Sequence, residues 1–427
     1  SIYSAKLGDH DPTTLEAKIR LGKMMEKNGD LDQALDLYYN VLIMRRAIKG
    51  ENDSSIPDCL TFLARALKKK LQYPQAIKEL KRALKLYREA LGDTHPRVTA
   101  TVDEISTLYI AVGDHLKAAA ILEEVVKLKA ATSGQQSMPV VATLHELASA
   151  YEQAGNYSKA VKPLKKAYAA CTQLKGEDSE EATNALEKIA RNYKAQKDKE
   201  RTAAAYLGVL RGRKASVGLS HPRVADAYFQ LGMALSDTGQ ADKAIKCMKQ
   251  ALAIYVGEGK NMRDVGMIAN VMREMALIHK KKGQLGDALK MLKQELTIRN
   301  KMGDQHQCEK AKTYYHLGNV EQSQRNTVKA LNYLMESLSI YEKLKDSSSM
   351  DFANTLYSTG QVFDSSRHPE RAKEAYVEAR KLFQKHDVPD SDPKMVLINK
   401  RCKELQSDKV KVTPVNVKNS TKEQVVC

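Results

Sequence analysis

Apolar residues recur along this chain at the three- and four-residue spacing of helix faces, and that pattern itself repeats in long units. Shifting the sequence against itself by 42 residues aligns a column of small residues, and one step alone measures 44 instead. This first column contains Gly22, Ala64, Ser106, Ala148, Ala190, Gly232, Ala276, Gly318 and Gly360. A period of this length is typical of a solenoid, in which each unit packs on its neighbours.

A second column of small residues lies twelve positions after the first. It contains Ala34, Ala76, Ala118, Ala160, Thr202, Ala244, Ala288, Ala330 and Ala372. A large residue follows four positions later, namely Tyr38, Leu80, Leu122, Leu164, Tyr206, Met248, Leu292, Leu334 and Tyr376. Two helices can approach closely only where the facing side chains are small. The pattern therefore predicts a helix A and a helix B in each unit, joined by turns that glycines such as Gly29, Gly113 and Gly155 indicate.

The predicted fold class is all-α: a right-handed superhelical solenoid of about nine helix pairs plus a C-terminal capping helix. The predicted units cover about 11–52, 53–94, 95–137, 138–179, 180–220, 221–262, 263–306, 307–349 and 350–387. We expect residues 1–10 to be a linker and residues 388–406 to form a helix that covers the apolar face of the last unit. We expect residues 407–427 to be a disordered basic tail.

The composition favours acidic partners, because the chain carries 69 Lys and Arg against 52 Asp and Glu, a net charge of +17. Acidic peptides, a microtubule surface, nucleic acid and anionic lipid all fit this charge. Nucleic acid is disfavoured, because the basic residues lack interleaved stacking aromatics; the chain has 5 Phe and no Trp. No apolar run reaches the roughly 18 residues of a membrane span.

Six single cysteines without metal-ligand spacing indicate reduced thiols in a cytoplasmic compartment. The sequence begins with Ser1 inside a linker-like segment, which leaves an organellar location open.

The motif Leu147-Ala148-x-x-Tyr151, followed by Ala160-x-x-x-Leu164, resembles the tetratricopeptide pattern. The long unit and its linker, Leu91-Gly92-Asp93-Thr94-His95-Pro96-Arg97-Val98, resemble the kinesin light chain family. The linker recurs as His221-Pro222-Arg223-Val224-Ala225. This resemblance covers nearly the whole repeat region. It implies a non-enzymatic adaptor, without cofactor or metal, whose repeats carry cargo proteins for a microtubule motor.

In a tetratricopeptide superhelix the A helices line the concave groove, and positions −3, +1, +4 and +5 from the first small residue point into it. Basic residues occupy many of these positions: Lys23, Lys27, Arg65, Lys68, Lys69, Arg191, Lys194, Arg273, Lys280 and Lys281. We expect them to bind carboxylates of an extended acidic peptide. The plainer alternative is a solvated helix face in a protein that is basic throughout.

Three functions remain open on these grounds. The leading hypothesis is a protein–protein interaction scaffold in the cytoplasm, with association with the cytoskeleton as one option, that recruits acidic segments to the groove. The alternatives are a microtubule-associated basic repeat protein and an assembly factor or structural subunit of a large complex. An enzyme is the least expected class, because no strand–turn–helix elbow supports a nucleophile.

Overall fold

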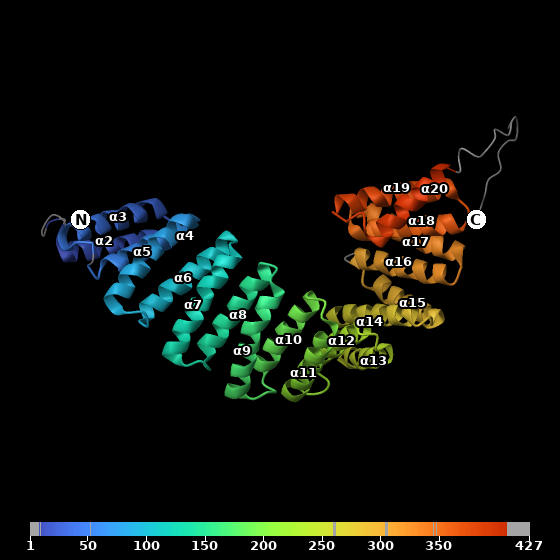
Figure 1. The fold of residues 1–427 in the computed structure, drawn as a ribbon, viewed down its shortest axis with the longest axis horizontal. Coiled ribbons are helices and arrows are strands. Elements are labelled where there is room, and N and C mark those ends of the chain that lie inside the picture. Colours follow the sequence, from blue (N-terminus) through green and yellow to red (C-terminus); the bar gives the residue numbers. More distant parts are fainter. Residues whose placement is uncertain are drawn as a thin grey trace. The chain divides into compact units, whose positions relative to one another are not determined.

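The computed structural model describes residues 8, 10–51, 53–258, 262–303, 306–344, 346 and 348–407. Within these ranges the chain forms nineteen α-helices, α2 to α20, and no strand (Figure 1). Each helix packs on the helix before it and on the helix after it within its own part of the chain. The prediction of an all-α fold built from tandem helix pairs is confirmed. The chain divides into two compact units, Ser1–Leu219 and Ser220–Cys427.

Unit 1 holds five helix pairs, in which the even-numbered helix is helix A and the odd-numbered helix is helix B. The pairs are α2 (Pro12–Asn28) with α3 (Leu31–Lys49), α4 (Ile56–Lys69) with α5 (Tyr73–Leu91), α6 (Pro96–Val112) with α7 (His115–Ser133), α8 (Met138–Gln153) with α9 (Tyr157–Lys175), and α10 (Glu180–Ala195) with α11 (Lys199–Val217).

Unit 2 holds four further pairs and one single helix. They are α12 (Pro222–Asp237) with α13 (Ala241–Glu258), α14 (Met262–Lys281) with α15 (Leu285–Lys301), α16 (Gln307–Ser323) with α17 (Thr327–Lys343), α18 (Met350–Ser365) with α19 (Pro369–Lys385), and α20 (Pro393–Ser407). Met395 and Ile398 of α20 are buried in one cluster with Phe383 of α19. Residues 408–427, nearly all of the predicted tail, lie outside the described residues, as do residues 1–7 of the predicted linker.

The two small-residue columns meet where helix A crosses helix B. A Cβ atom added at Gly318 would lie 2.7 Å from Leu334 Cγ and 3.1 Å from the carbonyl oxygen of Ala330. Ala330 and Leu334 belong to the second column and to the large-residue column, and both are fully buried. The columns therefore record close backbone approach, as the sequence pattern predicts.

Each turn between helices A and B places one residue in the left-handed conformation. Glycine occupies this position at Gly29, Gly113, Gly155, Gly239 and Gly283, whereas the other turns use Leu71, Lys197, Arg325 and Arg367. The B helices of unit 1 also end at glycines with positive φ, which lie 42 residues apart: Gly50, Gly92, Gly134, Gly176 and Gly218. These helix-ending glycines form a further column with the same period, which is absent from the predicted pattern.

A polar contact between helices A and B also recurs at one separation, 29 residues along the chain. The hydroxyl of Tyr87 donates to Asp58, and the hydroxyl of Tyr255 donates to Asp226. Arginine replaces tyrosine in two other pairs: Arg213 Nη2 donates to Asn184 Oδ1 at 2.6 Å, and Arg299 Nη2 donates to Asn270 Oδ1 at 2.6 Å. These contacts tie helix A to helix B in four of the nine pairs. In the described residues no helix is both long and apolar enough to cross a membrane.

Candidate functional site

An ion pair links the A helices of the first two pairs in unit 1. Lys69 Nζ of α4 lies 2.9 Å from Glu26 Oε1 of α2 and donates to the backbone carbonyl of Glu26 at 3.2 Å. Glu26 is buried and also accepts a hydrogen bond from the hydroxyl of Tyr38 at 3.2 Å. Lys69 therefore already has a carboxylate partner within the chain.

Phe62 of α4 lies beside this ion pair with a cation near its ring from each helix. Lys23 Nζ of α2 is 4.1 Å from the ring centroid, and Arg65 Cζ of α4 is 5.9 Å from it. Cations at these distances are attracted by the ring quadrupole. Phe62 is half-buried, and its ring centroid lies 5.9 Å from that of Tyr38. The contacts bring Lys23 and Arg65 together around one aromatic side chain.

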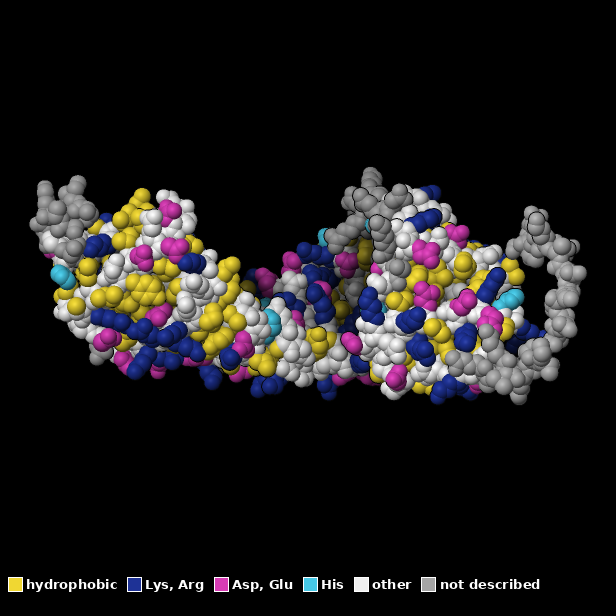
Figure 2. All heavy atoms as spheres, turned by 90° about the horizontal axis from the view of Figure 1, so that it is seen from above, with side chains coloured by type: hydrophobic (Ala, Val, Ile, Leu, Met, Phe, Trp, Pro, Cys, Tyr) yellow, Lys and Arg dark blue, Asp and Glu magenta, His cyan; other side chains and the backbone are white. Residues whose placement is uncertain are grey.

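We call this surface the α2–α4 basic face. It consists of Lys23, Lys27, Phe62, Arg65, Lys68 and Lys69, of which Lys27, Arg65 and Lys69 are exposed and the other three are half-buried. Figure 2 shows Lys and Arg side chains beside hydrophobic ones on the visible face of the first half of the chain. Phe62 does not belong to the predicted groove set, because it stands two positions before the small residue Ala64 and outside the four expected groove positions. The available signal was an aromatic side chain between predicted basic ones.

The other predicted groove residues of unit 1 stand apart from this face. Arg191 of α10 is exposed and forms an ion pair with Glu187, one turn earlier on the same helix, at 2.9 Å. Lys194 is exposed at the last turn of α10. In the described part of unit 1, no hydrogen bond or ion pair joins either residue to the α2–α4 basic face.

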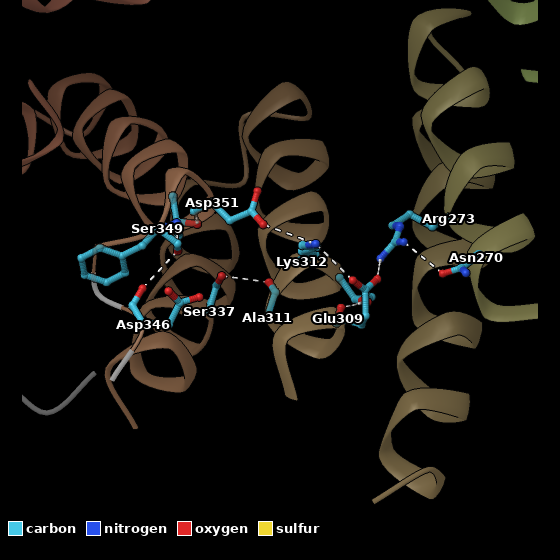
Figure 3. Close-up of polar contacts among 12 residues, drawn as sticks. Asn270, Arg273, Glu309, Ala311, Lys312, Ser337, Asp346, Ser349 and Asp351 are labelled. Atoms are coloured by element: carbon cyan, nitrogen blue, oxygen red, sulfur yellow. Dashed lines mark hydrogen bonds and ion pairs between the residues drawn. The ribbon is translucent and has the colours of Figure 1, made fainter. Parts of the chain in front are cut away.

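Arg273 in unit 2 does not lie open to a ligand as expected. Its side chain is 13% exposed, Nη1 lies 2.6 Å from Glu309 Oε2, and Nη2 donates to Asn270 Oδ1 at 3.0 Å. Figure 3 shows Glu309 between Arg273 and Lys312, with Lys312 reaching on to Asp351 at 3.3 Å. These contacts join α14, α16 and α18, so Arg273 is a structural residue whose charge is already paired.

Glu295 of α15 lies beneath this network and is fully buried. Its Oε1 atom lies 3.5 Å from Arg273 Nη1 and 3.5 Å from Arg299 Nε, yet neither oxygen accepts a hydrogen bond from a described residue. Burial raises the pKa of Glu295 to about 7, although both arginines oppose the shift. Burial would also raise the pKa of Glu309, but Arg273 and Lys312 outweigh it and lower the pKa to about 2.

The equivalent position is apolar in seven other units, which makes Glu295 an exception within the repeat. Those residues are Val41, Ala83, Val125, Ala167, Val209, Ala251 and Ala379, all of them buried. The remaining equivalent is Ser337, whose hydroxyl donates to the carbonyl oxygen of Ala311 at 2.8 Å (Figure 3).

Lys280 and Lys281 complete the predicted set. Lys281 is exposed at the end of α14, whereas Lys280 is half-buried and burial lowers its pKa. The neighbouring His316 of α16 has its pKa lowered to about 3 by burial and by Arg273, Lys280 and Lys312, so its imidazole is neutral at physiological pH.

The described residues contain no group of three His, Cys, Asp or Glu side chains placed to hold a metal ion. The five described cysteines, Cys59, Cys171, Cys247, Cys308 and Cys402, are free thiols. The side chains described above on the A helices are charged and aromatic ones.

Two family models match the chain. The tetratricopeptide repeat model matches residues 56–131 and 309–385, which correspond to α4–α7 and α16–α19. The model of soluble NSF attachment protein, SNAP, matches residues 151–305. The prediction of tetratricopeptide-type repeats is confirmed, and both matches point to a protein–protein interaction scaffold. A comparison with curated proteins finds no match.

Solved structures of repeat proteins resemble parts of the chain at low identity. Kinesin light chain TPR-like repeats from Podosopora anserina share 23% identity over 48% of this chain and 97% of that one, with a TM-score of 0.39. BtubC (BKLC) from P. vanneervenii shares 21% over 58% and 93%, with a TM-score of 0.37. A tetratricopeptide repeat protein from Parabacteroides merdae shares 15% over 72% and 98%, with a TM-score of 0.48.

Proposed function

We propose that this tetratricopeptide-repeat protein is a non-catalytic scaffold that holds acidic peptide segments of partner proteins on the α2–α4 basic face. The observation that supports this proposal best is the arrangement of Lys23 and Arg65 around the half-buried ring of Phe62. An acidic segment would find there both positive charge for its carboxylates and an aromatic surface for an apolar side chain.

The internal contacts divide the expected roles among the basic residues. Arg65 is exposed and can present its guanidinium edge to a carboxylate in a bidentate pair. Lys68, one turn further along α4, supplies a second cation on the same helix. Lys69 is a weaker candidate because it already forms an ion pair with Glu26. Arg273 is not a candidate because its charge is already paired with Glu309.

Charge reversal tests this proposal directly. We expect R65E/K68E to weaken binding to an acidic peptide library by at least about tenfold, the equivalent of about 1.4 kcal/mol. The matched control is K78E/K85E, which makes the same charge change at two exposed lysines of α5. Equal affinities for the wild type and R65E/K68E, with both proteins folded by circular dichroism, would remove the α2–α4 basic face as the binding site.

The resemblance to kinesin light chains extends the proposal to an adaptor that carries cargo for a microtubule motor. The net charge of +17 supports, as a second candidate, direct attachment to the acidic microtubule surface. Co-sedimentation separates the two: direct attachment predicts pelleting with microtubules that falls steeply as salt is raised, whereas an adaptor requires the motor for pelleting. Pull-down followed by mass spectrometry would identify the partner.

A further inference from the structure

A pocket of about 560 Å³ opens between the B helices α7 and α9, above the start of α8. Its floor is apolar and includes the buried residues Val140, Leu144 and Ala170. Its walls carry further alanines, among them Ala130 of α7 and Ala169 of α9. The rim is polar, with Lys127 on α7 and Lys166 on α9. Volumes of this size are typical of ligand-binding pockets.

The preceding step of the solenoid fills the same place with an ion pair. There Arg88 of α5 pairs with Glu124 of α7, and Arg88 Nε also lies 3.2 Å from Asp93 Oδ1. Moving 42 residues along the chain replaces Arg88 by Ala130, Glu124 by Lys166 and Asp93 by Gln135. The pocket is therefore open because both partners of the bridge are missing.

The following step also carries an ion pair in the corresponding place, between α11 and the linker that follows α9. Arg211 of α11 pairs with Glu177, and their equivalents at the pocket are Ala169 and Gln135. Ala130 at the pocket thus takes the place of Arg88 in the preceding step, and Ala169 takes the place of Arg211 in the following step. Packing of the repeat does not require alanine at these two positions, since the neighbouring steps pack with arginine there.

We propose that this pocket is a docking site for an amphipathic helix of a partner protein, which inserts a large apolar side chain and carries acidic residues beside it. The alanines of α7 and α9 allow another helix to approach closely. The walls are helices whose backbone amides are already hydrogen-bonded internally, so an extended segment would find few backbone partners there. A helical segment satisfies its own backbone.

The lysines at the rim of the pocket favour a partner with acidic side chains. Among the described residues, neither Lys127 nor Lys166 forms an ion pair, and the two lysines stand on opposite walls of the apolar floor. Acidic residues on either side of the inserted side chain complement both. This site lies between two B helices over the start of α8 and shares no residue with the α2–α4 basic face, so either proposal can fail alone.

The test uses a fluorescent alanine-based helical peptide of about 16 residues, with leucines at i, i+3 and i+7 and glutamates on both flanks. We expect the full chain to bind it, and A130R/K166E to bind at least about tenfold more weakly. That double variant installs the bridge that Arg88 and Glu124 form one unit earlier. A second variant, A169L, fills the pocket without changing its charge and should weaken binding as well.

Four results would overturn the proposal. The first is equal affinity of the wild type and both folded pocket variants. The second is equal binding of a peptide with glutamine in place of every glutamate. The third is loss of binding in R65E/K68E but not in A130R/K166E, which would move the peptide to the α2–α4 basic face and leave the proposed function standing. A wild-type dimer that A130R/K166E dissociates, without peptide binding, would also refute it, because the occupant would be a second copy.

Discussion

Replacing Glu295 with glutamine tests whether burial or the neighbouring arginines control this carboxyl group. The pKa of Glu295 is about 7 in the folded protein, against 4.5 for an ordinary glutamate. The folded state therefore binds this proton more tightly than the unfolded state does. The stability that results is fully present below pH 4.5, and it is lost as the pH rises through 7.

The expected size of this loss follows from the shift. One pKa unit corresponds to about 1.4 kcal/mol, so ionising Glu295 in the folded state costs up to about 3 kcal/mol. Glutamine keeps the shape of the side chain and has no proton to lose in this range. The stability of the wild type relative to E295Q should therefore fall by about 2 to 3 kcal/mol between pH 5 and pH 8.

The assay compares both proteins at each pH. Urea unfolding followed by circular dichroism gives the free energy of unfolding, and hydrogen exchange of the α15 amides reports local opening, which matters because a repeat array can unfold in parts. E309Q is the control. The pKa of Glu309 is lowered to about 2, so its stability is present above pH 4.5 and lost only as the pH falls towards 2. The cost of E309Q should stay constant from pH 5 to pH 8.

Two outcomes would refute the reasoning on Glu295. A difference between the wild type and E295Q that does not change with pH would mean that the carboxyl group ionises alike in the folded and unfolded states. A difference that moves in favour of the wild type as the pH rises would mean that Arg273 and Arg299, each 3.5 Å from the carboxylate, hold it ionised despite burial.

Three further changes test the packing of the repeat by urea unfolding. L71G should stabilise the protein by about 1 kcal/mol, because Leu71 is exposed with a φ of 62° that glycine adopts without strain; L71A should give no such gain. G318A should destabilise by about 1 to 3 kcal/mol through overpacking against Leu334 and the Ala330 carbonyl, whereas G266A, with its nearest neighbour at 3.5 Å, should be neutral or stabilising. Y255F should cost about 1.5 to 3 kcal/mol by removing the hydrogen bond to Asp226, and an unchanged midpoint would show that this recurrent contact does not hold the pair together.

The helix pairs could be predicted from the sequence because close approach of two helices leaves a mark on each partner. Gly318 and Ala330 are both small because helix A and helix B approach closely at this point, and the same close approach recurs along the repeat. Turn glycines such as Gly113 gave the same kind of signal. Where the left-handed position is held by Leu71 or Lys197 instead, the residue type carries no signal, and only the period locates the turn.

The sequence pattern could not predict which of the groove residues are free to bind a partner and which already form ion pairs within the chain. Arg273 and Arg65 stand at positions that the sequence pattern treats alike, as basic residues on the face of a helix A. Arg273 is nevertheless withdrawn into the structure, because Glu309 of the next helix A reaches it. No periodic rule specifies that partner. Whether a basic side chain is available depends on one acidic residue in another unit.

Departures from the repeat are informative because the repeat itself accounts for folding. Alanine or valine at the position of Glu295 is enough for packing in seven other units, so a buried carboxylate there has no packing reason. Likewise Ala130 leaves open a place that Arg88 closes one unit earlier. In a solenoid each unit contacts only its neighbours, so such an exception costs stability locally and leaves the other units unchanged. Selection can then keep a binding or charge-sensitive feature in one unit, and we therefore expect such exceptions, more than the overall positive charge, to indicate the functional features of this chain.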